Sequence, residues 1–125
     1  LLNVSVICLA ACIGALLRWG FALWLNPGGW LPWGTLAVNL IGGYLIGIAI
    51  TVFTQRPDID PAWRLVVVTG FLGALTTFSS FSAEVVTQLT QQRYGVALAT
   101  TALHVGGSFA LTFAGLRSAL WWLAR

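Results

Sequence analysis

The sequence contains little charge. Only 7% of its 125 residues are Asp, Glu, Lys or Arg, and lysine is absent, so all six basic residues are arginines. Hydrophobic residues make up 58% of the chain, and the mean hydropathy is +0.90. Such a chain has too few polar groups to cover a water-soluble surface, which predicts an integral membrane protein. The arginines are scattered, so the net charge of +3 does not indicate nucleic-acid binding.

Reactive and metal-binding residues are also scarce. The chain has two cysteines, one histidine and no methionine. Cys8 and Cys12 lie one helical turn apart without a histidine or acidic neighbour, so we interpret them as small packing residues rather than metal ligands. No recognisable spacing of serine, histidine and acid, or of cysteine and histidine, occurs, which argues against an enzyme. Because the sequence starts at Leu1, the initiator methionine is expected to lie outside it.

Four long apolar runs occupy most of the chain, at about 4–25, 33–53, 63–88 and 95–123. A membrane-spanning helix needs about 20 mainly apolar residues, so four is the most that this length can hold. Short polar segments separate the runs. The first run is long and contains Arg18, unlike the core of a signal peptide, so we expect it to span the membrane. The sequence therefore predicts a single all-α transmembrane domain over residues 1–125, with four helices.

The second run carries one amide side chain inside an apolar stretch, Asn39 in the segment GTLAVNLIGGYLIG. Gly43 and Gly47 follow at intervals of four residues, which favours close packing against another helix. Asn39 has two interpretations that residue type alone does not separate. It hydrogen-bonds to a neighbouring helix, or it is a donor that lines a pore.

The third run contains the most unusual segment, GFLGALTTFSSFSAE at residues 70–84. Glycine weakens a helix, and serine and threonine hydroxyls compete for backbone hydrogen bonds, so the segment predicts a break in the third helix. A broken helix exposes carbonyl oxygens that can coordinate a cation, while its half-helix ends and hydroxyls can face an anion. The alternative is a packing seam rich in serine and threonine.

Two further patterns lie in the third and fourth runs. Phe78 and Phe81 are three residues apart, so their rings project in similar directions, and their positive edges can approach a small anion. The alternative is an ordinary core pair. His104, Ser108 and Thr112 are spaced four apart on one helix face, where they hydrate an ion path or bond a partner helix. We assign His104 no role of its own.

Arg18 and Glu84 are ionisable groups inside expected spans, which marks each as a functional candidate. Either side chain can instead extend toward the membrane surface. Pairing of the two with each other is a third possibility.

Three segments together, GALLRWG, GTLAVNLIGG and GFLGALTTFSSFSAE, closely resemble the Fluc (CrcB) family of small fluoride channels, and the likeness covers all four runs. The resemblance implies a fluoride-selective passive channel that exports fluoride across the bacterial inner membrane. It also implies an antiparallel homodimer inserted in both orientations, with two fluoride pores and a structural sodium ion at the centre of the interface.

The resemblance also assigns roles to individual positions. It places Asn39, Phe78 and Phe81 along the fluoride path, Arg18 at a vestibule, and a polar track at Ser79, Ser80, Ser82, Glu84, Ser108 and Thr112. The sodium ion would be held by the backbone carbonyls of Gly73 and Thr76, so that two chains supply four oxygens.

Two other functions are alternatives to a channel. A proton-coupled exporter like the small multidrug transporters has a similar size, but those proteins depend on a carboxylate in the first span. Here the first run contains Arg18, and the carboxylate Glu84 lies in the third. A structural or assembly subunit would use its polar groups only for helix association and would conduct nothing. Net flux of fluoride separates these possibilities.

Overall fold

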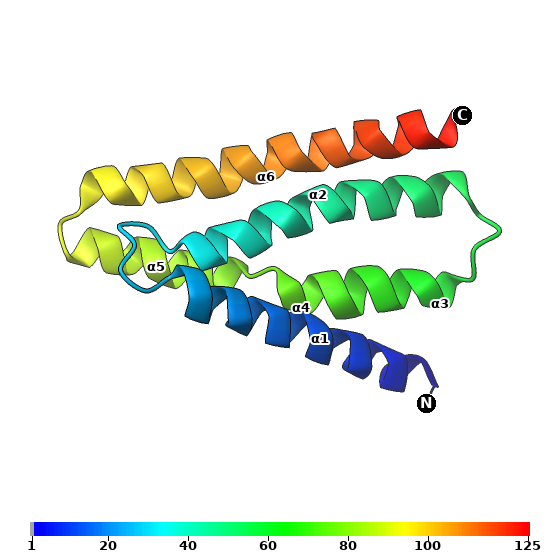
Figure 1. Cartoon of the computed structure of the whole chain (residues 1–125), viewed down its shortest axis with the longest axis horizontal. Helices are drawn as coiled ribbons and strands as arrows, with labels where there is room; N and C mark the ends of the chain where they lie inside the picture. The colour runs from blue at the N-terminus through cyan, green and yellow to red at the C-terminus, as the bar shows by residue number, and fades with distance from the viewer. Residues whose placement is uncertain (1) are drawn as a thin grey trace.

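The computed structural model describes residues 2–125, and every regular element in that range is a helix. The chain passes back and forth along one long axis (Figure 1). Four helical segments are long and apolar enough to cross a membrane, which confirms the expected number of spans: Asn3–Leu25, Trp33–Gln55, Pro61–Thr90 and Tyr94–Leu123.

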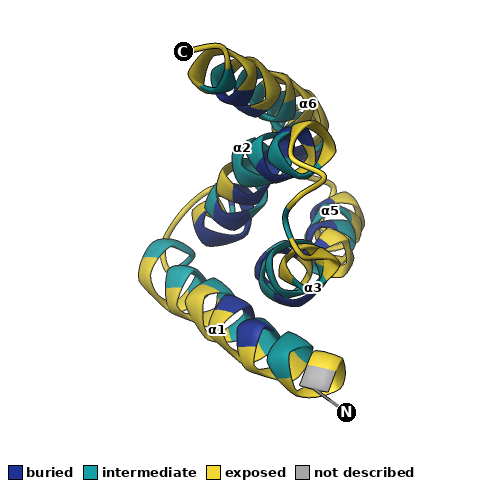
Figure 2. Cartoon of the chain, turned by 90° about the vertical axis from the view of Figure 1, so that its right-hand side faces the viewer, coloured by how far each residue is buried: buried dark blue, intermediate teal, exposed yellow. Residues whose placement is uncertain are grey.

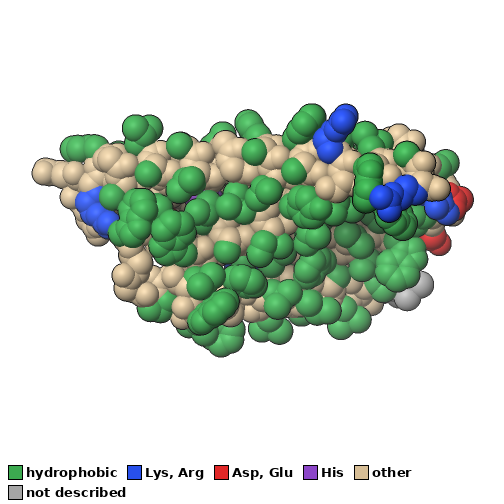
Figure 3. Space-filling view, turned by 45° about the horizontal axis from the view of Figure 1, so that its top comes forward, with side chains coloured by type: hydrophobic (Ala, Val, Ile, Leu, Met, Phe, Trp, Pro, Cys, Tyr) green, Lys and Arg blue, Asp and Glu red, His purple; other side chains and the backbone are tan. Residues whose placement is uncertain are grey.

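The first, second and fourth spans are continuous helices: α1 (Leu2–Leu25), α2 (Trp33–Gln55) and α6 (Tyr94–Leu123). Both termini and the connection after α2 lie at one end of the molecule, and the other two connections lie at the opposite end (Figure 1). Hydrophobic side chains cover the face between the ends, while charged side chains gather toward the ends (Figure 3). This distribution suits a bilayer, because the bilayer interior penalises charge.

The third span is divided into four pieces: α3 (Pro61–Arg64), the π-helix η1 (Leu65–Leu72), α4 (Gly73–Leu75) and α5 (Phe78–Thr90). Between α4 and α5 the backbone is extended, with φ −83° and ψ 156° at Thr76 and φ −152° and ψ 113° at Thr77. The predicted break in the third helix is therefore confirmed. The π-helical stretch before it was not predicted from the sequence.

Helix α2 occupies the centre of the arrangement. Seen from one end, α1 and α6 lie at opposite edges, with α2 and the third span between them (Figure 2). Helix α6 packs along α2, and α1 packs against η1, α4 and α2. Val38 and Ala49 of α2 pack with Leu72 and Leu75 of the third span in the buried apolar core.

Glycines allow α2 and α6 to approach closely, as Gly43 and Gly47 had predicted. A Cβ atom added at Gly47 would collide with the carbonyl oxygen of Thr112, and one added at Gly43 would lie 3.2 Å from the carbonyl oxygen of Ser108. A Cβ atom added at Gly115 of α6 would likewise collide with the Tyr44 carbonyl oxygen. The backbones themselves are therefore in contact along this interface.

Candidate functional site

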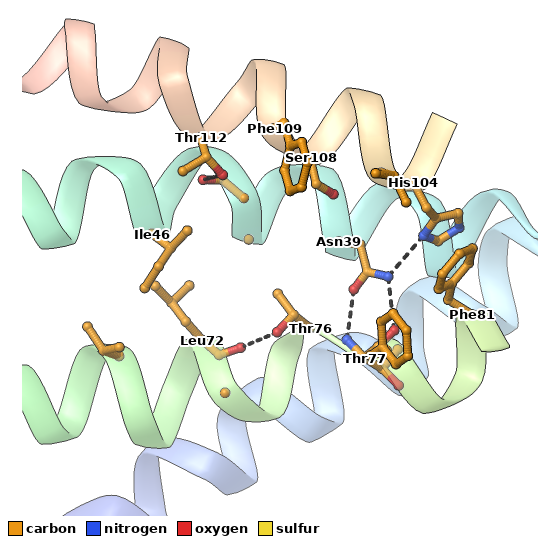
Figure 4. Close-up of a pocket in the computed structure, with 16 residues that line it drawn as sticks. Asn39, Ile46, Leu72, Thr76, Thr77, Phe81, His104, Ser108, Phe109 and Thr112 are labelled. Carbon is orange, nitrogen blue, oxygen red and sulfur yellow. Dashed lines mark hydrogen bonds between the residues drawn. The ribbon is translucent and has the colours of Figure 1, made fainter. Parts of the chain in front are cut away.

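The break in the third span is held by Asn39, which projects from α2 toward it (Figure 4). The Thr77 N–H donates to Asn39 Oδ1 at 2.7 Å, and Asn39 Nδ2 donates to the Thr77 carbonyl oxygen at 3.0 Å. One side-chain amide thus pairs with both backbone groups of an extended residue, which have no water partner within a membrane. Asn39 is therefore a hydrogen-bonding residue between helices, as the first of its two interpretations proposed.

The second amide hydrogen of Asn39 points toward the fourth span. Asn39 Nδ2 lies 3.1 Å from His104 Nδ1. The imidazole ring also stacks on Phe81, with ring centroids 4.5 Å apart and an interplanar angle of 23°. His104 and Phe81 are only 4% and 8% exposed. Side chains from α2, α5 and α6 therefore meet at this histidine.

The hydroxyl groups at the break form hydrogen bonds mainly with neighbouring residues of the same span. The Thr77 hydroxyl accepts from the Ser80 backbone N–H at 3.1 Å, so Thr77 is the N-cap of α5. It also donates to the Ser80 hydroxyl at 3.0 Å, and Ser79 Oγ lies 3.3 Å away. The Thr76 hydroxyl donates to the Leu72 carbonyl oxygen at 2.9 Å. These bonds replace part of the helical ladder that the break removes.

Two backbone carbonyls lose their usual helical donors at the break. In a continuous helix, the Gly73 oxygen would accept from the Thr77 N–H, and the Thr76 oxygen would accept from the Ser80 N–H. Here the Thr77 N–H bonds to Asn39, and the Ser80 N–H bonds to the Thr77 hydroxyl. Gly73 and Thr76 are the two positions at which sodium coordination is expected.

A cavity of about 520 Å³ lies beside the break, between α2, the third span and α6. No Asp, Glu, Lys or Arg side chain lines it in the described part of the chain. Many of the predicted site residues share its lining: Asn39, Gly73, Thr76, Phe78, Phe81, Ser108 and Thr112. Residues from three separate spans thus converge on one uncharged cavity.

The two phenylalanines are neighbours but differ in burial. The rings of Phe78 and Phe81 pack edge to face, with centroids 5.5 Å apart and an interplanar angle of 70°. Phe81 is buried, whereas Phe78 is 77% exposed on the surface of the single chain. Only Phe81 is therefore held rigidly by its own chain.

The polar stripe on α6 lies on one face, as its spacing predicted. His104, Ser108 and Thr112 all line the 520 Å³ cavity (Figure 4). The Thr112 hydroxyl donates to the Gly43 carbonyl oxygen at 2.9 Å, so it bonds the partner helix α2. The Ser108 hydroxyl faces the cavity. The stripe therefore serves both helix packing and the cavity wall.

Arg18 lies in a second cavity of about 310 Å³, together with Thr35, Thr77 and Ser80. Its Nε atom is buried without a hydrogen-bond partner among the described residues. Because Thr77 lines both cavities, the extended segment at the break is a wall that they share.

Glu84 faces a third cavity, of about 370 Å³, near the ends of α1 and α5. Its Oε1 atom accepts from the Thr35 hydroxyl at 2.5 Å. Its Oε2 atom and the Gln88 Oε1 atom are buried and have no partner in the described structure. Glu84 does not pair with Arg18, since the one ion pair between residues 2 and 125 joins Arg56 and Asp58 at 3.0 Å.

The residues predicted to form a polar track line different cavities of the single chain. Ser108 and Thr112 line the first cavity, Ser80 the second and Glu84 the third. Ser79 and Ser82 line none of these three. Ser80 and Glu84 are four residues apart and lie on one side of α5, about 6 Å apart along its axis, whereas Ser79 points about 100° away from Ser80.

Sequence reasoning did not predict the N-cap role of Thr77, did not single out Thr35 or Gln88, and gave His104 no role. Thr77 carried a usable signal, because a threonine directly before a helix is a preferred N-cap. The other three depend on contacts between helices far apart in the chain, which no local pattern reports.

Comparison with known proteins connects this geometry to a family. A family model described as "CrcB-like protein, Camphor Resistance (CrcB)" matches residues 5–116. A fluoride-specific ion channel FluC of Paracidovorax citrulli (strain AAC00-1) is 80% identical over 125 residues, which cover 100% of this chain and 99% of that protein. The protein with the same name from Variovorax paradoxus (strain S110) is 64% identical over 118 residues, covering 94% of each chain. With four spans and this family match, the chain is a multi-pass membrane protein that belongs to the CrcB family.

Proposed function

We propose that this chain forms a fluoride-selective passive channel that exports fluoride across the bacterial inner membrane. The observation that carries the proposal is the uncharged 520 Å³ cavity, where an aromatic pair, an amide and hydroxyls from three spans converge beside a helix break. Its relatives are named fluoride-specific ion channels. Ring edges and hydroxyls bind an anion weakly, which suits a site that must also release it.

The expected residue roles fit this cavity in different ways. Phe81 is fixed by its stack on His104, so it presents a ring at a defined place. Both hydrogens of the Asn39 amide are engaged within the chain. A donor role for Asn39 toward fluoride therefore requires that one of these two bonds exchanges as the ion passes.

The proposal includes an antiparallel homodimer with two pores. Phe78 supports it, because an aromatic side chain that lines the cavity is left 77% exposed by its own chain, and a second copy can cover it. The carbonyls of Gly73 and Thr76 support it as well. Two oxygens are too few to enclose a cation, whereas two chains supply four.

The same carbonyls fit a structural sodium ion. Among the described residues there is no group of three His, Cys, Asp or Glu side chains that could hold a metal, so the ligands must come from elsewhere. Backbone carbonyl oxygens at an unwound helix are suitable ligands for a sodium ion. When bound, sodium would neutralise the partial negative charges of carbonyls that face one another across the dimer.

Removal of sodium is expected to weaken the dimer. Purification with N-methylglucamine in place of sodium should lower both the thermal unfolding midpoint and the fluoride efflux, because the carbonyl oxygens then repel one another. Tryptophan fluorescence during heating measures the first quantity, and readdition of sodium should restore both. Equal stability and equal flux with and without sodium would contradict the sodium site.

The function is tested by flux from liposomes. Purified protein is reconstituted into potassium-loaded liposomes, valinomycin is added, and fluoride and chloride efflux are compared with ion-selective electrodes. We expect rapid release of fluoride with chloride retained. Retention of both ions, from a preparation shown to be folded, would favour a structural subunit.

Substitution of Phe81 tests the aromatic wall of the path. Phe81→Ile should reduce fluoride efflux, because it removes both a ring edge and the stack on His104. Phe113→Ile is a matched control, since Phe113 lies on α6, is 65% exposed and does not line the cavity. Equal efflux from the two variants would exclude Phe81 from the pore.

Substitution of Glu84 separates a channel from a proton-coupled exporter. Glu84→Gln should retain fluoride efflux, because an amide oxygen can still accept from the Thr35 hydroxyl and a passive channel needs no titrating carboxylate. An exporter driven by protons through Glu84 would lose transport. Efflux measured with and without an imposed pH gradient distinguishes the two outcomes.

A further inference from the structure

We infer that His104 is a positioning residue that holds the Asn39 amide in the one orientation able to pair with the helix break. The amide must present its oxygen to the Thr77 N–H and its nitrogen to the Thr77 carbonyl oxygen. One amide hydrogen then remains, and it is directed at His104 Nδ1, 3.1 Å away. A buried N–H left without an acceptor destabilises a fold, so the ring nitrogen completes the arrangement.

This contact determines the tautomer of the histidine. Nδ1 can accept the amide hydrogen only if it carries no hydrogen itself, so the neutral ring must be protonated at Nε2. The Nε2 atom is buried and has no hydrogen-bond partner among the described residues, so the contact with Asn39 is the hydrogen bond that selects the tautomer. If Nδ1 were protonated, its N–H would face the amide N–H. A half-turn of the Asn39 amide would relieve that contact. It would also place the amide oxygen against the Thr77 carbonyl oxygen, so that two acceptors would face each other. The tautomer of His104 and the pairing at the break are thus linked.

The ring is well held for this task. His104 is 4% exposed, and the buried Phe81 stacks on its face at 4.5 Å. The groups that contact it are uncharged, Asn39 from α2 and Phe81 from α5, and no Asp, Glu, Lys or Arg side chain lines the adjoining cavity. In the described part of the chain no carboxylate forms an ion pair with the ring, and Glu84 of α5 accepts from the Thr35 hydroxyl instead. His104 therefore contacts Phe81 in the cavity wall through its ring face and Asn39 at the break through Nδ1.

The inference is directly testable because the chain contains one histidine. Protein labelled with ¹⁵N-histidine and reconstituted into lipid bilayers gives ring signals from this residue alone. We expect one neutral form, with a protonated Nε2 and an unprotonated, hydrogen-bonded Nδ1. A mixture of both tautomers, as for a free imidazole, or a protonated Nδ1 would overturn the inference. This measurement does not depend on whether the protein conducts fluoride.

Two variants separate positioning from packing. His104→Phe retains a flat ring against Phe81 but has no acceptor, whereas His104→Gln loses the ring and offers an amide oxygen to Asn39. We expect fluoride efflux to fall roughly tenfold in His104→Phe, the effect of losing about one buried hydrogen bond, and to be largely retained in His104→Gln.

A role in packing alone predicts the opposite order, with the phenylalanine variant the more active. That order, or equal efflux from both variants, would overturn the inference. The efflux measurement rests on the proposed function, whereas the ¹⁵N measurement of the tautomer does not. Absence of fluoride flux from the unmodified protein would therefore count against the channel and leave the ¹⁵N result to decide the role of His104.

Discussion

Gly115→Ala is expected to prevent stable packing of α6 on α2. The added Cβ would collide with the Tyr44 carbonyl oxygen and lie 3.0 Å from its carbonyl carbon and 3.2 Å from the Ile48 nitrogen. These are backbone atoms of a helix, so they cannot rotate away as a side chain can. Overpacking of this kind costs about 1–3 kcal/mol, and more where the backbone is rigid. We expect a much lower thermal unfolding midpoint, or no monodisperse protein after extraction into detergent.

The same helix supplies a matched control. Gly95 also lies in α6, and a Cβ atom added there meets nothing within 4 Å in the described chain. Gly95→Ala should keep or raise the midpoint, because alanine favours a helix over glycine. If Gly115→Ala were as stable as Gly95→Ala, the close backbone contact between α2 and α6 would be wrong.

Asn39→Asp is expected to abolish most of the fluoride efflux. Aspartate can still accept from the Thr77 N–H, but it has no N–H for the Thr77 carbonyl oxygen or for His104 Nδ1. Two acceptors would then face a carboxylate, which also adds negative charge beside a cavity that no Lys or Arg side chain lines. Losing two buried hydrogen bonds corresponds to roughly a 100-fold effect, measured as fluoride efflux from liposomes.

Asn26→Asp is the control for this substitution. Asn26 uses its side-chain oxygen to accept from the Gly34 N–H at 2.7 Å, and aspartate keeps that acceptor. We expect efflux close to that of the unmodified protein. Efflux from Asn39→Asp at the level of Asn26→Asp would show that the amide N–H groups at the break are dispensable.

The features predicted from the sequence share one property, which is that they depend on neighbours along the chain. The four spans follow from the length of apolar runs, because a helix must cover the bilayer thickness with apolar side chains. The break follows from glycines and hydroxyls that weaken the local helix at residues 70–84. Gly43 and Gly47 likewise indicated a close interface before any partner was known.

The features that were missed depend on rotation of one helix against another. The hydroxyls after the break follow one another in the sequence, yet Ser80 and Glu84, which lie one turn apart on the same side of α5, line separate cavities because different parts of the chain surround them. The residue type of Asn39 allows two interpretations, and its two hydrogen bonds with Thr77 show that it bonds across to the third span. His104 looked like one polar residue among three, and its contact with Asn39 spans 65 positions of sequence.

The sequence by itself thus determined that this is a four-span membrane protein with an interrupted third helix, since hydropathy and helix propensity act locally. Only the tertiary structure decided which polar groups bond to one another and which are left facing a cavity. The physical reason is that a buried polar group takes whichever partner its neighbouring helices bring within hydrogen-bond distance. At the break of this chain, those partners are Asn39 from α2 and, through Asn39, His104 from α6.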